Sequence, residues 1–160
     1  MVKMEIKRLT DKNSPLFEKV LEWNYNWWGV AQGKSLGEVR CQMEHSLNTG
    51  NKLPQTFVAL DGDKAVGVYQ LSMVDDLPGR PDVYPWLINV FVPERERGKN
   101  ICRYMMESVK ENAKQAGIRE LYLYTSHVGL YEKFGWEFIE FVDTFKENAE
   151  KERLYKLNIE

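Results

Sequence analysis

The nearly unbroken apolar run Tyr84–Val92 limits what this chain can fold into more than any other feature. Such a strand is typical of the middle of a sheet whose two faces are both covered. After a short basic loop, Gly98–Ala116 carries apolar residues at spacings of three and four, the pattern of a helix with one buried face. That face has to lie on the sheet. The two segments together predict an α/β domain.

The remaining segments complete a mixed, mostly antiparallel sheet with helices on both faces. Serine N-caps predict helices after Ser14 and after Ser35, and a short helix is expected over Val128–Phe134. At 160 residues the chain has the length of one domain, which we place over residues 1–160. We expect further strands over Met4–Thr10, Gln55–Leu60, Lys64–Leu71, Glu120–Thr125, Glu137–Val142 and Arg153–Ile159.

Charge and residue usage exclude several classes of protein. Twenty-two basic and 24 acidic side chains leave a net charge of −2, whereas nucleic-acid binders usually have a basic excess. No apolar run is long enough to cross a bilayer, and the charged first residues do not resemble a signal peptide. The two histidines lack the spacing of a metal site. We therefore expect a cytoplasmic protein, a monomer or homodimer, that binds no metal, nucleic acid or membrane.

The loop before the long helix is the first candidate site. Arg97 and Lys99 flank Gly98 directly before the predicted first turn, whose free N–H groups and positive dipole end suit a phosphate. Gly98 and Asn100 are the residue types that best tolerate left-handed backbone. A solvated charged loop that merely turns the chain is the alternative interpretation.

A second candidate is Tyr131-Glu132-Lys133-Phe134-Gly135-Trp136, a short helical turn that ends at a glycine before an aromatic residue. Taken alone, this segment favours Tyr131 as a packed aromatic side chain.

Together the two stretches resemble the GNAT superfamily of acetyl-CoA-dependent N-acetyltransferases. Arg97-Gly98-Lys99-Asn100-Ile101-Cys102 is similar to the family signature R/Q-x-x-G-x-G/A, and the segment from Tyr131 is similar to its Y-E-K-x-G-F/W motif. Asn100 and Cys102 stand where the signature has glycine or alanine, and an alternative frame begins at Arg95. The resemblance implies a sheet splayed into a central V between Tyr84–Val92 and Glu120–Thr125.

The same resemblance implies the site for acetyl-CoA. The signature residues would grip its pyrophosphate, while the backbone of Val90 and Val92 would pair with the pantetheine arm. The Val90 N–H would polarise the thioester carbonyl, and Tyr131 would act as the acid that protonates the departing thiolate. The cofactor-binding residues expected in this way are Val90, Val92, Arg97, Gly98, Lys99, Asn100, Ile101 and Cys102.

The implied reaction is direct attack by an amine of a small molecule or peptide on the thioester. Trp23, Tyr25, Trp27 and Trp28 place four large rings within six residues. Trp23 and Trp27 lie on the apolar stripe of their helix and are expected to pack under the sheet. From this region and the central strand we expect Trp27, Trp28 and Asn89 to bind the substrate.

The base that removes the amine proton stays open between ordered water and the side chains of Asp75, Asp76 and His127. Two rival functions also stay open. Because Tyr84–Val92 contains no acid, the chain could be a non-catalytic CoA-binding or peptide-binding module on the same fold. A nucleotide or polyanion binder using the basic loop is the other, which the net negative charge disfavours.

Overall fold

The computed structural model describes residues 4–75, 77–144 and 150–159. Its centre is a seven-stranded sheet in the order β1-β2-β3-β4-β5-β7-β6. Neighbouring strands are antiparallel except β4 and β5, which run parallel. The strands are β1 (Met4–Leu9), β2 (Gln55–Asp61), β3 (Lys64–Ser72), β4 (Trp86–Phe91), β5 (Glu120–Thr125), β6 (Glu137–Val142) and β7 (Glu152–Asn158).

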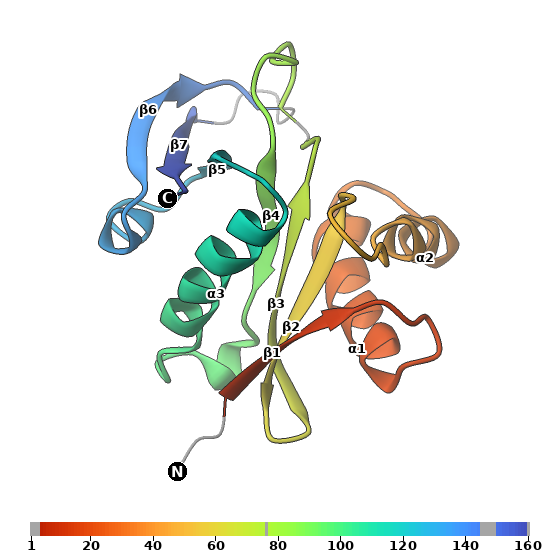
Figure 1. The fold of residues 1–160 in the computed structure, drawn as a ribbon. Coiled ribbons are helices and arrows are strands. Elements are labelled where there is room, and N and C mark those ends of the chain that lie inside the picture. Colours follow the sequence, from red (N-terminus) through yellow and green to blue (C-terminus); the bar gives the residue numbers. More distant parts are fainter. Residues whose placement is uncertain (1–3, 76, 145–149, 160) are drawn as a thin grey trace.

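Helices cover both faces of this sheet, as the sequence predicted (Figure 1). The hydroxyl of Ser14 caps the first helix, and Ser35 forms a capping box with Glu38 at the start of the second. The helical elements are α1 (Pro15–Asn24), the π-helix η1 (Tyr25–Gly29), α2 (Leu36–His45), the turn η2 (Glu94–Glu96), α3 (Ile101–Gln115) and the turn η3 (Tyr131–Phe134). The last of these is shorter than the helix expected over Val128–Phe134.

Each face of the sheet has its own apolar core. On one face α3 contributes Met105 and Val109, both fully buried, to a cluster with side chains of β2, β3, β5 and β7. Gly67 in β3 lets the helix approach closely, because a Cβ there would stand 2.9 Å from the Sδ of Met105. On the other face α1 and α2 pack Phe17 and Val39 against β2 and β3.

The buried stripe of α3 is rotated relative to the one that the apolar spacing predicted, which is Cys102, Met106, Val109, Ala113 and Ala116. Ile101 and Met105 are buried, whereas Cys102 is only partly buried at the edge of the cluster. Cys102 therefore packs at the rim of the apolar core, near the start of α3, and not between α3 and the sheet.

The sheet opens into a V between β4 and β5. The two strands pair only at Trp86 and Tyr122, close to the beginning of β4. Trp86 and Leu87 are buried, but the rest of β4, up to Phe91, is only partly buried. The expectation of a strand covered on both faces throughout is thus wrong for the second half of β4. Its apolar side chains Ile88, Val90 and Phe91 pack at the margins of the apolar clusters instead of at their centres.

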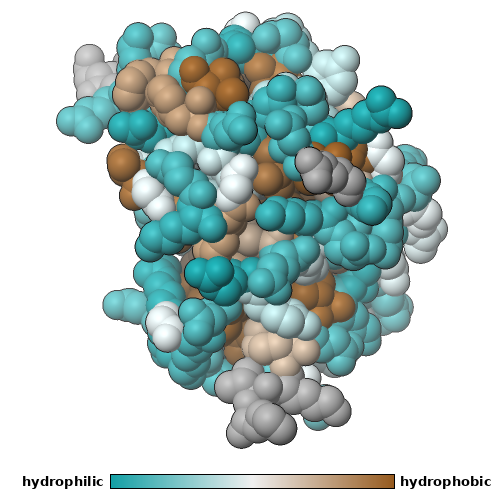
Figure 2. Space-filling model, turned by 60° about the vertical axis from the view of Figure 1, so that its left-hand side comes forward, coloured by the Kyte–Doolittle hydropathy of each residue, from teal (hydrophilic) through white to brown (hydrophobic). Residues whose placement is uncertain are grey.

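The edge strand β6 carries the largest cluster of exposed apolar side chains in any described strand. Figure 2 turns this side of the molecule forward and shows apolar side chains interrupting a largely hydrophilic surface. In β6, Phe138, Ile139 and Phe141 are 41%, 45% and 53% exposed. Arg153 of β7 lies 5.1 and 4.9 Å from the centroids of the two phenylalanine rings, so its guanidinium shields them in part. Within the described ranges, no helix has the length and apolar character needed to span a bilayer.

Candidate functional site

A bulge in β4 shapes the opening. Val68 of β3 pairs with Phe91, and Gln70 pairs with Ile88, so β4 has one extra residue in this interval. Asn89 absorbs the extra length with a φ of 53°, a left-handed conformation that asparagine tolerates better than most residues. A bulge bends its strand and re-aims the neighbouring groups. Because β5 does not pair with β4 beyond Trp86, the backbone of Val90 in β4 and of Val92 directly after it is not paired with β5.

The loop that follows β4 has the conformation expected of a phosphate-binding helix start. Gly98 and Asn100 have φ values of 82° and 61°, so both adopt the left-handed backbone that their residue types tolerate. Asn100 is the N-cap of α3, and its side chain makes no capping hydrogen bond. The N–H groups of the first turn, starting at Ile101, therefore have no side-chain acceptor from the cap. A pyrophosphate fits this helix start, which also carries the positive end of the dipole.

The two basic side chains of this loop have partners. The Glu96 carboxylate, only 3% exposed, accepts hydrogen bonds from the ammonium of Lys64 at 2.5 Å and of Lys99 at 3.0 Å. These two contacts hold the pKa of Glu96 below its ordinary value. Arg97 donates from Nε to the carbonyl of Val92 at 3.0 Å. Lys99 is thus tied to Glu96, a buried acid that nothing in the sequence pattern identified.

Tyr131 opens the turn η3 and is buried, with 7% of its surface exposed. Its ring contacts those of Trp136 and Tyr155, at centroid distances of 6.1 and 6.3 Å. Burial, with a smaller contribution from nearby Cys102, raises the pKa of the Tyr131 phenol. The phenol therefore stays protonated throughout the ordinary pH range. Burial likewise raises the pKa of the Cys102 thiol, which makes it a poor nucleophile.

A pocket of about 250 Å³ lies on the face covered by α1 and α2. Two of the predicted substrate-binding residues, Trp28 and Asn89, line it together. The indole Nε1 of Trp28 is buried and has no hydrogen-bond partner among the described residues. The other polar residues of the wall come from α2 and the residues on either side of it, from β3 and from the loop after β3, namely Gln32, Gln42, His45, Ser46, Gln70, Ser72 and Asp75.

The third predicted substrate-binding residue, Trp27, lies outside this wall. Its ring stacks on Phe91 of β4 at 5.8 Å and is 44% exposed, whereas Trp23 beside it is buried. The expectation that Trp27 packs under the sheet is therefore wrong, and that for Trp23 is confirmed. The change from α-helix to π-helix at Tyr25 accounts for the difference. A π-helix has more residues per turn than the α-helix on which the expected apolar stripe was based.

The candidate bases are placed differently. Asp75 lines the pocket, whereas His127 lies exposed in the loop after β5. Asp76 lies outside the described residues. His45 of α2, which was not among the candidate bases, also lines the pocket. Gln70, Ser72 and His45 carried no sequence signal, because each is one polar residue within an ordinary strand or helix.

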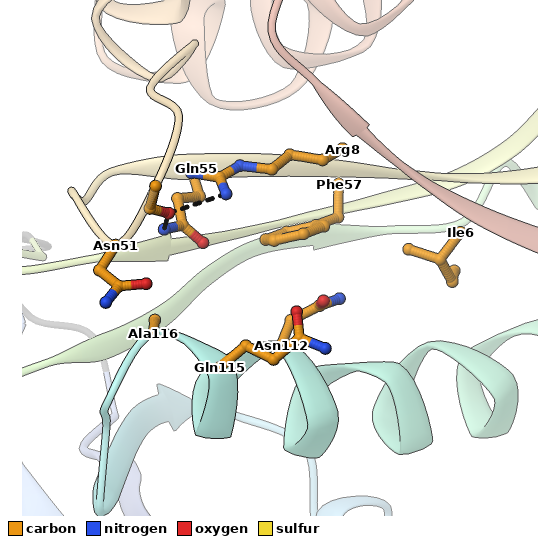
Figure 3. Close-up of a pocket in the computed structure, with 9 residues that line it drawn as sticks. Ile6, Arg8, Asn51, Gln55, Phe57, Asn112, Gln115 and Ala116 are labelled. Atoms are coloured by element: carbon orange, nitrogen blue, oxygen red, sulfur yellow. Dashed lines mark hydrogen bonds between the residues drawn. The ribbon is translucent and has the colours of Figure 1, made fainter.

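A second pocket, of about 230 Å³, lies on the other face of the sheet near the last turn of α3 (Figure 3). Arg8 donates to the carbonyl of Gly50 there, and Asn112 and Gln115 of α3 form part of the wall. None of the predicted site residues lines it. Over the described ranges no group of three metal-ligating side chains occurs.

Comparison with known proteins agrees with this geometry. Residues 8–139 match the family model of the acetyltransferase (GNAT) domain. An aminoglycoside 6'-N-acetyltransferase solved with coenzyme A superimposes with a TM-score of 0.73 at 15% identity, over 98% of this chain and 97% of that one. An aminoglycoside 6'-acetyltransferase type Ii gives 0.72 at 18%, over 98% and 97%. A Bacillus subtilis acetyltransferase in complex with CoA gives 0.63 at 16%, over 99% and 100%. No curated protein matches the chain by sequence.

Proposed function

The chain belongs to the GNAT acetyltransferase family, and from this premise we propose that it transfers the acetyl group of acetyl-CoA to an amine of a small molecule or peptide. Acetyl-CoA supplies an activated acetyl thioester, and the amine attacks its carbonyl carbon directly. A C–N bond forms, the C–S bond breaks, the amine loses a proton and the departing thiolate gains one.

The side of the V next to α3 supports the cofactor half of this proposal. The uncapped N–H groups at Ile101 and the left-handed backbone of Gly98 and Asn100 form a cradle for the pyrophosphate. Arg97 would exchange the Val92 carbonyl for a phosphate oxygen, which frees that carbonyl for an N–H of the pantetheine arm. Lys99 would act from its ion pair with Glu96 and contribute less than an unpaired lysine.

The catalytic groups are assigned from the same geometry. The backbone N–H of Val90, next to the bulge at Asn89, would polarise the thioester carbonyl. Tyr131 would donate its proton to the thiolate sulfur, since its raised pKa keeps a proton available at neutral pH. Of the described candidates for the base, Asp75 is the one that lines the substrate pocket, and a water held there would serve as the relay.

The pocket behind Asn89 supports the acceptor half. Trp28 and Asn89 would bind the amine substrate, and the unpartnered Nε1 of Trp28 offers it a hydrogen bond. Trp27, stacked on Phe91, would cover the substrate from the exposed side. The bulge at Asn89 is the observation that carries the proposal. It lies in the β4 segment that forms one wall of the open V and also contributes to this pocket.

The test combines binding and turnover. We expect acetyl-CoA and CoA to raise Tm, whereas ATP and an oligonucleotide leave it unchanged, because only a ligand of the folded state stabilises it. Release of free CoA in the presence of a panel of primary amines then measures transfer. Stabilisation by CoA without release of CoA from acetyl-CoA for any amine would favour the non-catalytic CoA-binding module instead. Stabilisation by ATP or the oligonucleotide would favour the polyanion binder.

A further inference from the structure

Four polar side chains form a buried chain of hydrogen bonds from the β4 bulge to the end of α2. Asn89 Nδ2 lies 2.6 Å from Gln70 Oε1, and Gln70 Nε2 lies 2.9 Å from Thr56 Oγ1. Thr56 Oγ1 lies 2.6 Å from Ser46 Oγ, which in turn lies 2.6 Å from the carbonyl oxygen of Met43. Gln70, Thr56 and Ser46 are 6%, 0% and 1% exposed, whereas the Asn89 end of the chain is partly buried at the pocket.

The direction of every hydrogen bond in this chain follows from its last member. The Met43 carbonyl can only accept a hydrogen bond, so the Ser46 hydroxyl must donate its one hydrogen to that carbonyl. Thr56 must then donate to Ser46, which leaves Thr56 able to accept from Gln70. The Gln70 amide therefore turns its NH₂ group to Thr56 and its oxygen to Asn89.

These hydrogen-bond directions fix the orientation of the Asn89 side-chain amide. Its NH₂ group must face Gln70, so Oδ1 is the atom of this side chain that can accept a further hydrogen bond. Asn89 and Gln70 both line the pocket of about 250 Å³. Turning the Asn89 amide over would place its oxygen against that of Gln70. Relieving that clash would require every link to reverse, which the Met43 carbonyl does not allow.

We propose that Gln70, Thr56 and Ser46 are positioning residues that hold Asn89 Oδ1 as a fixed acceptor for an N–H of the substrate amine. The inference rests on the proposed function and adds to it a source of selectivity. A fixed acceptor favours a substrate that presents an N–H donor beside the bulge over one that presents only acceptor atoms. Thr56 is fully buried beneath the pocket wall and acts only through Gln70.

The central test removes the hydroxyl of Thr56, a residue that does not line the pocket. Thr56→Val keeps the shape of the side chain but deletes the link between Gln70 and Ser46. We expect KM for the best amine to rise about tenfold, as for a lost hydrogen bond, while KM for acetyl-CoA stays the same. Thr56→Ser keeps the hydroxyl and should restore the wild-type KM for the amine.

A second variant allows the hydrogen bonds to reverse their donor–acceptor direction while it keeps the contact between Gln70 and Asn89. In Ser46→Ala, Thr56 no longer has to donate to Ser46, so its hydroxyl can turn to Gln70 and the amides of Gln70 and Asn89 can both flip. We expect a rise of the amine KM similar to that of Thr56→Val. This variant also keeps the proposal testable if Thr56→Val does not fold.

The matched control is Ser108→Ala on the opposite face. Its hydroxyl contacts Tyr69 at 2.8 Å and Asn112 at 2.9 Å in a comparable polar cluster. We expect this variant to leave the amine KM unchanged. An unchanged amine KM in folded Thr56→Val and Ser46→Ala, or an equal rise in Ser108→Ala, would overturn the inference while wild-type turnover sustains the proposed function. A wild-type protein that acetylates no amine would overturn both.

Discussion

Tyr69 and Gln70 are neighbours in β3, but they belong to opposite faces of the sheet and to two different polar clusters. On the α3 face, Tyr69, Ser108 and Asn112 form a closed triangle with contacts of 2.7 to 2.9 Å. Burial raises the pKa of Tyr69 to about 12, so this triangle stays neutral and ties α3 to the sheet. On the other face, the chain from Gln70 ends at Asn89 in a pocket. Both clusters satisfy buried polar groups, but only the second presents an acceptor atom at a pocket.

The same division applies to the proposed site. Groups assigned to acetyl-CoA come from the end of β4 and from two short stretches of sequence near α3, Arg97–Cys102 and Tyr131–Trp136. Groups assigned to the amine come from α2, β3, β4 and the π-helix between α1 and α2. Changes beside α3 should therefore alter cofactor binding or the chemical step. Changes around the pocket, except at the proposed base Asp75, should alter the KM of the amine.

The largest effect is expected for Tyr131→Phe. The substitution keeps the ring among Trp136 and Tyr155 and removes only the proposed proton donor. We expect kcat with saturating acetyl-CoA to fall roughly 10²-fold or more, the usual scale for a lost general acid. Tm and CoA affinity should change little. Full kcat in this variant would make Tyr131 a packing residue and leave protonation of the thiolate to water.

A smaller effect is expected for Arg97→Ala, which tests the helix start. Loss of one hydrogen bond to a charged group, about 1.5–3 kcal/mol, should weaken the Kd for CoA roughly ten- to a hundredfold in calorimetry. Arg119→Ala, an exposed arginine beyond the other end of α3, is the control and should leave the Kd unchanged. Equal affinities of wild-type and Arg97→Ala proteins would contradict the assignment of the signature to Arg97–Cys102.

Trp28→Phe tests the pocket side and should have a more modest effect. The indole Nε1 is buried without a described partner, so its removal breaks no described hydrogen bond in the free protein but loses the proposed one to the substrate. A neutral hydrogen bond is worth about 0.5–1.5 kcal/mol, so we expect the amine KM to rise roughly two- to tenfold. KM for acetyl-CoA serves as the internal control. A change confined to acetyl-CoA would place Trp28 on the cofactor side.

The smallest effect concerns Glu96 and acid stability. Its folded pKa is held below the ordinary value of 4.5 by Lys64 and Lys99, so the unfolded chain binds the proton more readily. The contacts therefore stabilise the fold above pH 4.5, and this stabilisation is lost as the pH falls through the folded pKa. We expect Tm of the wild-type protein to fall below pH 4.5, and that of Glu96→Gln to fall less steeply. Parallel Tm profiles would show that the ion pairs contribute nothing.

Much of the fold was predictable because its signals are local. The strands Glu120–Thr125 and Glu137–Val142 have the predicted bounds, and both serine caps start helices as expected. The left-handed backbone at Gly98 and Asn100 was also predictable, because only a few residue types tolerate that conformation. The predictions that failed depended on neighbours. The π-helix at Tyr25 turned Trp27 outward, and β4, which pairs with β5 only at Trp86, is only partly buried from Ile88 on, although its composition indicated full burial.

The sequence by itself determined the family, because the two motifs that carry the resemblance, Arg97–Cys102 and Tyr131–Trp136, are each contiguous along the chain, and residues 8–139 match the acetyltransferase (GNAT) domain. The residues proposed to bind acetyl-CoA follow from the same two motifs and the strand before them. Only the tertiary structure shows the hydrogen-bond network beside the pocket. Ser46, Thr56, Gln70 and Asn89 belong to α2's end and three strands, and no spacing between them has a meaning along the chain. Their hydrogen bonds exist because the sheet places β2, β3 and β4 side by side and α2 ends above them, so that one carbonyl orients a side chain 46 positions away.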